Sequence, residues 1–228
     1  MALRFLRRVR SFGVDARGVI HVGAHEAQEL RGYLRFGFER QLWIEPQPEI
    51  FARLVAKLPK DPMVRAAQVA CGDSAGQATM HVLNNNDGMS NSLLEPKLHL
   101  SEYPQITRGG TFTVPVARLD DVIEQQGFET EQFSLLAVDV QGFEMQVFKG
   151  APRTLQTIGA VVAEVYNREL YAGCALLPEI DACLEAAGLE RVGLRWTKHH
   201  YGDALYVRRG SIKLWHRLRQ GVLGPLRR

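Results

Sequence analysis

Apolar residues in the first third of the chain recur in short runs that alternate with stretches of helical spacing. Residues 18–24 form an apolar run that includes two glycines, and residues 26–36 carry Leu30, Tyr33 and Leu34 at helical spacing. The same alternation then predicts a strand, a helix and a strand over residues 41–45, 50–58 and 63–70. Short connections in this βαβαβ order predict a parallel sheet with right-handed crossovers.

The second half of the chain continues this order. Strands are expected at residues 77–83, 111–118, 135–139, 160–165, 191–197 and 204–208, and helices at 119–126, 143–148 and 177–187. The last two strands flank a polar turn at residues 199–203, so they form a hairpin that breaks the parallel order. No internal repeat or second-domain boundary interrupts the pattern, which predicts a single α/β domain of the Rossmann-like type.

One stretch between the predicted strands, residues 84–110, loses all periodicity and is rich in Asn, Ser, Gly and Pro. Compact domains seldom keep loops longer than about 12 to 15 residues unless the loops bind ligands or act as lids. We therefore expect this stretch to face a substrate, with Asn84, Ser90, Asn91 and Ser92 as candidate contacts. The alternative is a disordered connector.

Composition and charge narrow the class of protein. Of the 228 residues, 46% are hydrophobic and 23% are charged, which is typical of a soluble globular domain and excludes fibrous, collagen-like and disordered classes. The formal net charge of +3 is too small to indicate a nucleic-acid partner, and we expect none. Three cysteines without CxxC spacing favour a reducing, cytoplasmic setting over a disulfide scaffold or a zinc knuckle.

Both ends of the chain are basic and amphipathic. The first ten residues hold four arginines and no acid, and the last sixteen hold five basic residues and no acid. We divide the chain into a basic segment at 1–17, a main domain at 18–209 and a second basic segment at 210–228. The two ends either cap the core with solvated charges or make peripheral contact with an anionic membrane at its inner face. The sequence contains neither a secretory signal nor the roughly 20 apolar residues that span a bilayer, and it leaves the oligomeric state open.

A glycine at the end of the first strand marks a candidate cofactor site. Gly23 would let the backbone approach a ligand and, by opening directly into a helix, would present N–H groups to it. Glu45 follows at the tip of the second strand, where Rossmann-type folds place an acid that accepts both ribose hydroxyls, although alone it could be a turn residue. The later glycines of the G-x-G-x-x-G fingerprint are missing, which argues against NAD or FAD and is compatible with a smaller adenosine cofactor without phosphates.

Further acids stand at predicted strand ends. Asp73 follows Gly72 after the third strand, where a side chain would face adenine, and an ordinary turn aspartate is the alternative. Asp139 ends a buried strand at the edge where open α/β folds bind ligands, and Glu144 follows one turn later. Glu164 interrupts an otherwise apolar run, and a buried charge is costly unless it is paired or used.

The pattern formed by these residues resembles the FkbM family of class I methyltransferases. The segments that carry the resemblance are Val22-Gly23-Ala24-His25, Glu45-Pro46, Cys71-Gly72-Asp73, Ser90-Asn91-Ser92, residues 116–120, Asp139-Val140-Gln141-Gly142-Phe143-Glu144 with Gly150, and residues 203–206. It covers about residues 18–209 and implies a mostly parallel seven-stranded sheet with an antiparallel last strand and helices on both faces. It also implies S-adenosyl-L-methionine as methyl donor and O-methylation of a hydroxyl on a sugar, glycan or other small molecule.

Residue roles follow from the motifs and this resemblance. The residues expected to bind the donor are Val22, Gly23, Ala24, His25, Gln28, Glu45, Gly72, Asp73 and Asp139. Asp139, Glu164 and His200, or His199 beside it, are candidates for the base that takes a proton from the acceptor, although loop histidines are more often solvated. Glu144 joins residues 84–92 as a candidate for acceptor binding. The sequence departs from the usual family residues at His21, Ala27 and Gln141. These departures bear on which side chains contact the cofactor, and they leave Glu45 and Asp139 in place.

Other functions remain open at this stage. No metal is expected, because the acids and histidines that could be imagined as ligands lack a compact spacing; these are His21, His25, His199, His200, Asp139 and Glu164. The chain could instead be a non-catalytic adenosine-cofactor-binding module held at a membrane by its basic ends. A nucleotide-dependent oxidoreductase is a further alternative, because fold alone does not separate these activities.

Overall fold

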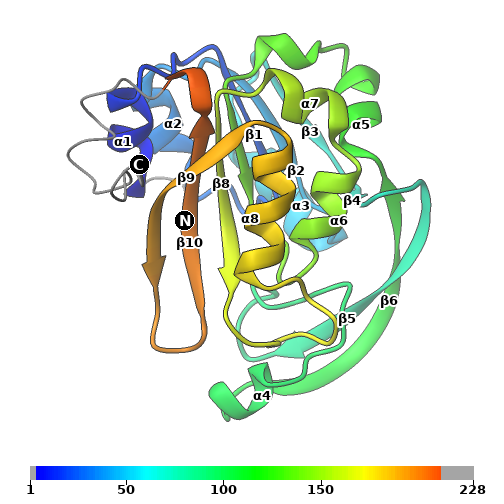
Figure 1. Ribbon diagram of the computed structural model, residues 1–228. Coiled ribbons are helices and arrows are strands. Elements are labelled where there is room, and N and C mark those ends of the chain that lie inside the picture. The colour runs from blue at the N-terminus through cyan, green and yellow to red at the C-terminus, as the bar shows by residue number, and fades with distance from the viewer. Residues whose placement is uncertain (1–3, 212–228) are drawn as a thin grey trace, which may run out of the picture.

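The computed structural model describes residues 4–211 of the chain (Figure 1). Its elements in chain order are α1 (Leu6–Ser11), β1 (Gly18–Val22), α2 (Leu30–Phe36), β2 (Arg40–Ile44), α3 (Pro48–Lys57), β3 (Val64–Ala67), β4 (Ala70–Cys71), β5 (Gly76–Asn84), α4 (His99–Glu102), β6 (Thr107–Ala117), α5 (Leu119–Gln125), the 3-10 turn η2 (Thr130–Gln132), β7 (Leu135–Val138), α6 (Glu144–Lys149), α7 (Pro152–Thr157), β8 (Ala160–Tyr166), α8 (Leu177–Ala186), β9 (Leu189–Trp196), β10 (Tyr201–Arg208) and η3 (Arg209–Ser211).

A seven-stranded sheet with the order β3-β2-β1-β7-β8-β10-β9 forms the centre of the molecule. The first five strands in this order (β3, β2, β1, β7 and β8) are parallel to one another, and β10 runs antiparallel to both of its neighbours, β8 and β9. This confirms the predicted fold class, including the antiparallel last strand. The strand order reverses between β1 and β7, and open α/β sheets bind their ligands at the carboxyl ends of the strands at such a switch point.

Helices cover both faces of this sheet, as predicted (Figure 1). One buried cluster joins the sheet to α1, α2 and α3 through side chains such as Leu6, Tyr33 and Leu54. The other joins the opposite face to α5, α6, α7 and α8 through side chains such as Val122 and Phe148. Because β1 and β7 are covered on both faces, every residue in them is buried, which accounts for their continuous apolar runs.

A second, three-stranded sheet with the order β4-β6-β5 lies beyond the carboxyl ends of the central strands (Figure 1). The strand predicted at residues 63–70 is in fact divided between the two sheets, because β3 pairs with β2 whereas β4 pairs with β6. The irregular stretch predicted at 84–110 is also shorter than expected. The long β5–β6 hairpin extends as far as the Asn84 and Thr107 pair, and the short helix α4 lies within the remaining loop.

Two glycines join the small sheet to the rest of the domain. A Cβ atom on Gly150, at the end of α6, would lie 1.9 Å from the carbonyl oxygen of Gly72, so the two backbones touch with no space for a side chain. The N–H of Gly72 donates to Ala117 at the end of β6, and the carbonyl of Gly150 accepts from Asp120 in α5. The base of the small sheet is therefore docked directly on α5 and α6.

Two predicted boundaries were wrong. The helix expected at 26–36 begins only at Leu30, because His25 and Ala27 have φ values of 44° and 57°, which a right-handed helix does not accommodate. The glycine turn therefore does not open directly into a helix. The turn expected at 199–203 ends before Tyr201, where β10 starts, and Gly202 pairs so tightly with β9 that a Cβ atom would lie 2.4 Å from the Arg195 carbonyl.

The N-terminal basic segment contributes α1 to the core. Leu6 and Val9 are buried against the central sheet, whereas Arg7 and Arg10 are exposed. This arrangement agrees with the capping interpretation for this end of the chain. Most of the C-terminal segment predicted at 210–228 lies outside the described residues. Among the described helices, none is long and apolar enough to cross a membrane.

Candidate active site

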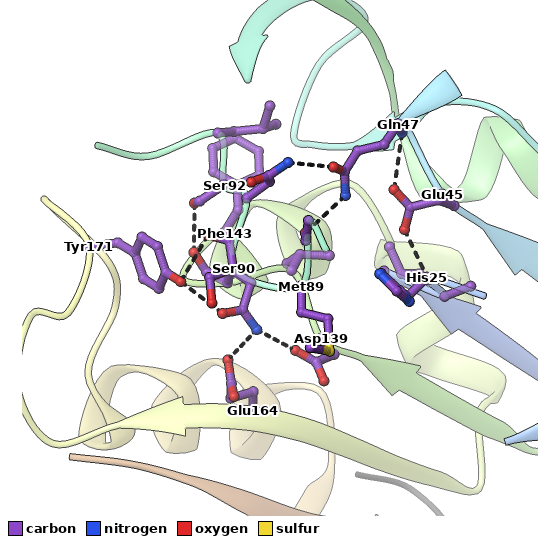
Figure 2. A pocket seen from close by; sticks show the side chains of 18 of the residues that line it. His25, Glu45, Gln47, Met89, Ser90, Ser92, Asp139, Phe143, Glu164 and Tyr171 are labelled. Carbon is purple, nitrogen blue, oxygen red and sulfur yellow. Dashed lines mark hydrogen bonds between the residues drawn. The ribbon is translucent and has the colours of Figure 1, made fainter. Parts of the chain in front are cut away.

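A cavity of about 610 Å³ opens at the carboxyl ends of β1, β2, β7 and β8. Its volume is typical of a small-molecule site, and Figure 2 shows many of the side chains that line it. The predicted site residues that line the cavity are Val22, Gly23, Ala24, His25, Gln28, Glu45, Ser90, Asn91, Ser92, Asp139 and Glu164. Those that do not are Gly72, Asp73, Asn84, Glu144 and His200, together with its neighbour His199.

Glu45 is buried at the end of β2, with its carboxylate held by two backbone N–H groups (Figure 2). The N–H of His25 donates to Oε2 and the N–H of Gln47 donates to Oε1, both at 3.0 Å. Burial raises the pKa of Glu45, and these backbone hydrogen bonds oppose the rise. Each oxygen has accepted one hydrogen bond, so each retains capacity to accept another from a ligand in the cavity.

Gly23 brings the ends of β1 and β7 into direct contact. Its φ is +78°, and a Cβ atom at this position would lie 1.8 Å from the carbonyl oxygen of Asp139. The N–H groups of Gly23 and Ala24 both donate to the carbonyl of Ile44, which fixes the turn against β2. A glycine is therefore required here by sterics as well as by its left-handed backbone.

Asp139 and Glu164 meet through the side-chain amide of Gln141. The Gln141 Nε2 atom donates to Asp139 Oδ1 at 2.8 Å and to Glu164 Oε2 at 3.0 Å. Its Oε1 atom accepts from the hydroxyl of Tyr171 at 2.8 Å, which sets the orientation of the amide. Tyr166 also donates to Glu164. Within the described part of the chain, Asp139 Oδ2 has no hydrogen-bond partner, so it is available to a ligand.

Both carboxyl groups have raised pKa values. Burial raises the pKa of Asp139 to about 6, and the hydrogen bond from Gln141 opposes part of this effect. Burial, followed by the nearby charges of Asp139 and Glu144, raises the pKa of Glu164 well above its ordinary value. Burial therefore favours the protonated form of both side chains.

Three of the predicted residues outside the cavity have other contacts. Glu144 Oε1 accepts from the N–H groups of Val140 and Gly142 beneath the cavity wall, so it shapes the loop after β7. Asp73 is exposed and accepts from Ser74, and Asn84 donates to the carbonyl of Arg108 in the small sheet. Their placement gives no support to direct contact with a ligand.

The two loop histidines lie on the outside of the hairpin between β9 and β10. His200 contacts Asn167 through Nδ1 at 3.1 Å, and His199 contacts Glu102 through Nδ1 at 3.1 Å. His199 also packs on the ring of Tyr103, with 4.5 Å between the ring centroids. These contacts join the hairpin to α4, and they do not bring either imidazole to the cavity wall.

An aromatic wall that sequence reasoning missed faces the carboxyl pair. Its members line the cavity and are His99, Tyr103, Tyr166, Tyr171 and Tyr201. The ring of His99 packs on Tyr103 and Tyr171, and burial lowers its pKa to about 4, which keeps it neutral. His99 and Tyr103 come from the aperiodic stretch at residues 84–110, which was the available signal. Tyr166 and Tyr201 stand at the ends of β8 and β10, and Tyr171 lies in the loop after β8, so no local pattern marks them as a group.

His21 belongs to the packing of the sheet as well as to the cavity wall. It stacks on Trp43 with 5.4 Å between ring centroids, accepts or donates a hydrogen bond with the Tyr33 hydroxyl at 3.1 Å, and has its pKa lowered by burial. Within residues 4–211, no group of three or more acids, histidines or cysteines could hold a metal ion. Carboxyl, amide and aromatic side chains line the cavity.

The donor side of the cavity fits an adenosine cofactor without phosphates. Glu45 offers carboxylate oxygens with remaining capacity to accept hydroxyl donors, and Gly23 lets the backbone reach the cavity. The helix α2 starts seven residues after Gly23, so the glycine turn does not open directly into a helix N-terminus as it does in a pyrophosphate site. The residues that would hold S-adenosyl-L-methionine here are Gly23, Ala24, His25 and Glu45.

An open sheet with this strand order, a glycine turn after its first strand and an acid after its second defines a Rossmann-like, adenosine-binding α/β protein of the class I methyltransferase type. The family described as "Methyltransferase FkbM domain" matches residues 21–190. The chain belongs to this family.

Similar proteins are found by sequence and by structure. The chain is 32% identical over 162 residues to the 2-O-methyltransferase NoeI of Sinorhizobium fredii (strain NBRC 101917 / NGR234). The aligned region covers 68% of this chain and 65% of that relative. The chain thus spans about two thirds of the length of that relative. Among solved structures, magnesium protoporphyrin IX methyltransferase of Synechocystis PCC 6803 with bound SAM is 9% identical with a TM-score of 0.49, covering 90% of this chain and 76% of that one. The N-methyltransferase NodS of Bradyrhizobium japonicum WM9 is 10% identical with a TM-score of 0.48, covering 90% and 93%.

Proposed function

We propose that the protein is an S-adenosyl-L-methionine-dependent O-methyltransferase that acts on a hydroxyl of a sugar, glycan or other small molecule. The observation that carries the proposal is that one cavity connects the Glu45 carboxylate with the Asp139 and Glu164 carboxyl pair. Membership of the FkbM methyltransferase family supports methyl transfer, and the 2-O-methyltransferase relative supports a hydroxyl as the acceptor.

On the donor side, Glu45 accepts hydrogen bonds from the ribose hydroxyls while the backbone around Gly23 forms the adjoining wall. The bound donor supplies a methyl group that is already activated on a sulfonium sulfur. The protein therefore has to align the acceptor and remove one proton, and alignment alone can contribute much of the rate enhancement.

On the acceptor side, Asp139 is the base. Its Oδ1 is held by Gln141, while Oδ2 has no partner among the described residues and can take the proton of an acceptor hydroxyl. Glu164, whose pKa is raised by burial, lies beside Asp139 on the Gln141 amide and helps to hold the acceptor's hydroxyl groups. The aromatic wall of His99, Tyr103 and Tyr171 packs against the acceptor's apolar face.

Calorimetric titration tests the donor assignment. We expect S-adenosylhomocysteine to bind and NADH not to bind. Tight binding of NADH alone would support the oxidoreductase alternative and overturn the proposal. Binding of S-adenosylhomocysteine without turnover on any hydroxylated acceptor would support the non-catalytic module instead.

The acceptor is found by a comparison of cells with and without the gene. Mass spectrometry of their cell-envelope glycans and metabolites should reveal a species that is about 14 daltons heavier when the gene is present, the mass that a methyl group adds when it replaces hydrogen. Cytoplasmic placement and peripheral contact with an anionic membrane are part of the same proposal. Flotation with anionic vesicles, before and after removal of residues 212–228, tests the membrane contact.

A further inference from the structure

We propose that Gln47 and His25 are positioning residues that latch residues 85–92 over the donor side of the cavity, so that this segment must detach before the donor can enter or leave. The inference rests on the proposed function, because it takes the Glu45 side of the cavity to be the donor site. We refer to residues 85–92 as the cover segment. It follows β5 at the tip of the small sheet, and its residues Gly88, Met89, Ser90, Asn91 and Ser92 line the cavity.

Gln47 contacts both the ribose acid and the cover segment. Its backbone N–H donates to Glu45 Oε1 at 3.0 Å. Its side-chain Nε2 donates to the carbonyl of Gly88 at 3.2 Å, and its Oε1 accepts from the Asn91 side chain at 2.5 Å (Figure 2). The same residue therefore fixes the carboxylate through its main chain and the cover segment through its side chain.

His25 repeats this arrangement from the other side of Glu45. Its backbone N–H donates to Glu45 Oε2 at 3.0 Å, and its ring Nε2 lies 2.8 Å from the carbonyl oxygen of Asp87. Because a carbonyl oxygen only accepts, Nε2 carries the proton, and Nδ1 accepts from the Gln28 amide at 2.8 Å. Both residues that hold the ribose acid thus also hold the cover segment.

The backbone of the cover segment is shaped for this contact. Asn85, Asp87 and Gly88 all have positive φ, so the chain turns sharply toward the wall formed by β2 and α3. A Cβ atom on Gly88 would lie 2.9 Å from Gln47 Oε1 and 2.6 Å from Ile50 Cδ1, so a larger residue at that position would push both side chains aside and oppose a φ of +76°. On the solvent-exposed side of the segment, Asp87 forms an ion pair with Arg53 of α3 at 3.0 Å.

The far end of the cover segment reaches the acceptor side. The hydroxyl of Ser92 donates to the carbonyl of Gln141 at 2.6 Å, and the hydroxyl of Tyr171, which donates to Gln141 at the shorter distance, lies 3.2 Å from the carbonyl oxygen of Ser90. Ser90 and Ser92 are buried, whereas Met89 between the two ends of the segment is 55% exposed. The segment is therefore anchored at both ends, and its latch contacts with Gln47 and His25 lie directly over Glu45.

The dissociation rate of S-adenosylhomocysteine from the full-length protein tests the latch. Gln47→Met removes both side-chain contacts with the cover segment and the side-chain interaction with Glu45, and it keeps the backbone N–H that binds Glu45. Glu45→Gln, which leaves both contacts with the cover segment in place, shows how far the loss at Glu45 alone changes the rate. Because Gln47→Met loses two hydrogen bonds to the cover segment, we expect its dissociation rate to rise by about tenfold. We also expect faster amide hydrogen exchange in residues 85–92, and slower exchange there when wild-type protein binds S-adenosylhomocysteine.

A matched control lies in the same segment. Asn85 donates to the carbonyl of Gln105 at 3.0 Å, away from Glu45, and Asn85→Asp removes this bond while tolerating the left-handed backbone. The control should leave the dissociation rate within twofold of wild type. If Gln47→Met does not fold, Gly88→Ala opens the latch from the opposite side, because its Cβ would displace the Gln47 amide.

Three results would overturn the latch. A dissociation rate for Gln47→Met within twofold of wild type would do so, as would an equal rise in Asn85→Asp. Unchanged hydrogen exchange in residues 85–92 when S-adenosylhomocysteine binds would show that the segment does not cover the donor. Failure of the wild-type protein to bind S-adenosylhomocysteine at all would instead overturn the proposed function, and the latch with it.

Discussion

At the scale of single residues, the contact between Gly23 and the Asp139 carbonyl is the tightest constraint in the cavity wall. Gly23→Ala adds a Cβ atom at 1.8 Å from that oxygen and also opposes a φ of +78°. We expect a loss of about 3 kcal/mol or more in the free energy of unfolding, because the two strand ends must separate. Urea denaturation measures the loss.

Gly13 provides the matched control for this change. It has a φ of +80°, and a Cβ atom there would meet no atom within 4 Å. Gly13→Ala should therefore cost only the backbone strain, about 1–2 kcal/mol. Equal losses in the two variants would show that the contact with Asp139 is relaxed at no cost.

Glu45 is the residue on which donor binding should depend most. In Glu45→Gln one oxygen is replaced by an N–H donor, which would face the N–H of His25 or of Gln47 and could not accept from ribose. We expect S-adenosylhomocysteine to bind about tenfold to a hundredfold more weakly, as measured by calorimetry. Glu49→Gln removes the same charge from an exposed position in α3 and should leave the affinity unchanged.

Asp139 should titrate close to neutrality. Burial raises its pKa to about 6, so the carboxyl-carbon signal in an NMR titration should have its midpoint there, with Asp139→Asn used for assignment. Because the base must be ionised, methyl transfer should fall as the pH drops through about 6. A midpoint below 5 would argue that the side chain is better solvated than the structure indicates.

The residues found from the sequence and those that were missed differ in a physical respect. The residues predicted from the sequence lie in strands or directly after them, where the end of an apolar run marks the edge of the sheet; they are Gly23, Glu45, Asp139 and Glu164. Gln47 and the aromatic wall owe their place to partners far along the chain, such as the contact of Gln47 with residues 88 and 91. Contacts between residues so far apart in the chain cannot be predicted from a local sequence pattern.

At the scale of elements, α1 is part of the core. Leu6 is 1% exposed and packs in the cluster beneath the central sheet, whereas Arg7 beside it is exposed. Leu6→Ala should lower the free energy of unfolding by about 2–5 kcal/mol, and Arg7→Ala should change it little. Thermal or urea unfolding distinguishes the two. Similar stabilities would mean that α1 detaches from the sheet in solution.

The inner strands β1, β2, β7 and β8 were predictable because they are buried on both faces. In the small sheet, much of β5 and β6 was predicted, but β4 and the start of β6 were not. β4 contains only two residues, and its partner β6 follows more than thirty residues later. β6 begins in the run Thr107-Arg108-Gly109-Gly110, which has no alternation to mark a strand. Pairing between distant segments, rather than local propensity, determines these elements.

At the scale of the whole molecule, the buried carboxyl groups make stability depend on pH. Burial raises the pKa of Glu144 from its ordinary value of 4.5 to about 8, so the folded protein holds this proton more tightly than the unfolded chain does. The stabilisation of the folded state that comes from this proton has its full value below pH about 4.5 and is lost as the pH rises through about 8. Asp139, Glu164 and Asp203 have raised pKa values and act in the same direction.

Glu144→Gln isolates the contribution of that residue. Glutamine keeps an oxygen that accepts from Val140 and Gly142 but does not titrate. Between pH 5 and pH 8 the wild-type protein should lose more unfolding free energy in urea than the variant does. Parallel pH profiles for the two proteins would place the titration on another group.

The contact between Gly72 and Gly150 also bears on how quickly the protein can exchange its ligand. Since the base of the small sheet is docked directly on α5 and α6, the sheet cannot swing as a body, and only its tip at residues 85–92 is free to open. Loop motions of this size occur within nanoseconds to microseconds, whereas domain closures take microseconds to milliseconds. Turnover should therefore be paced by chemistry or by release of the ligand with detachment of residues 85–92, with no slow domain rotation between one cycle and the next.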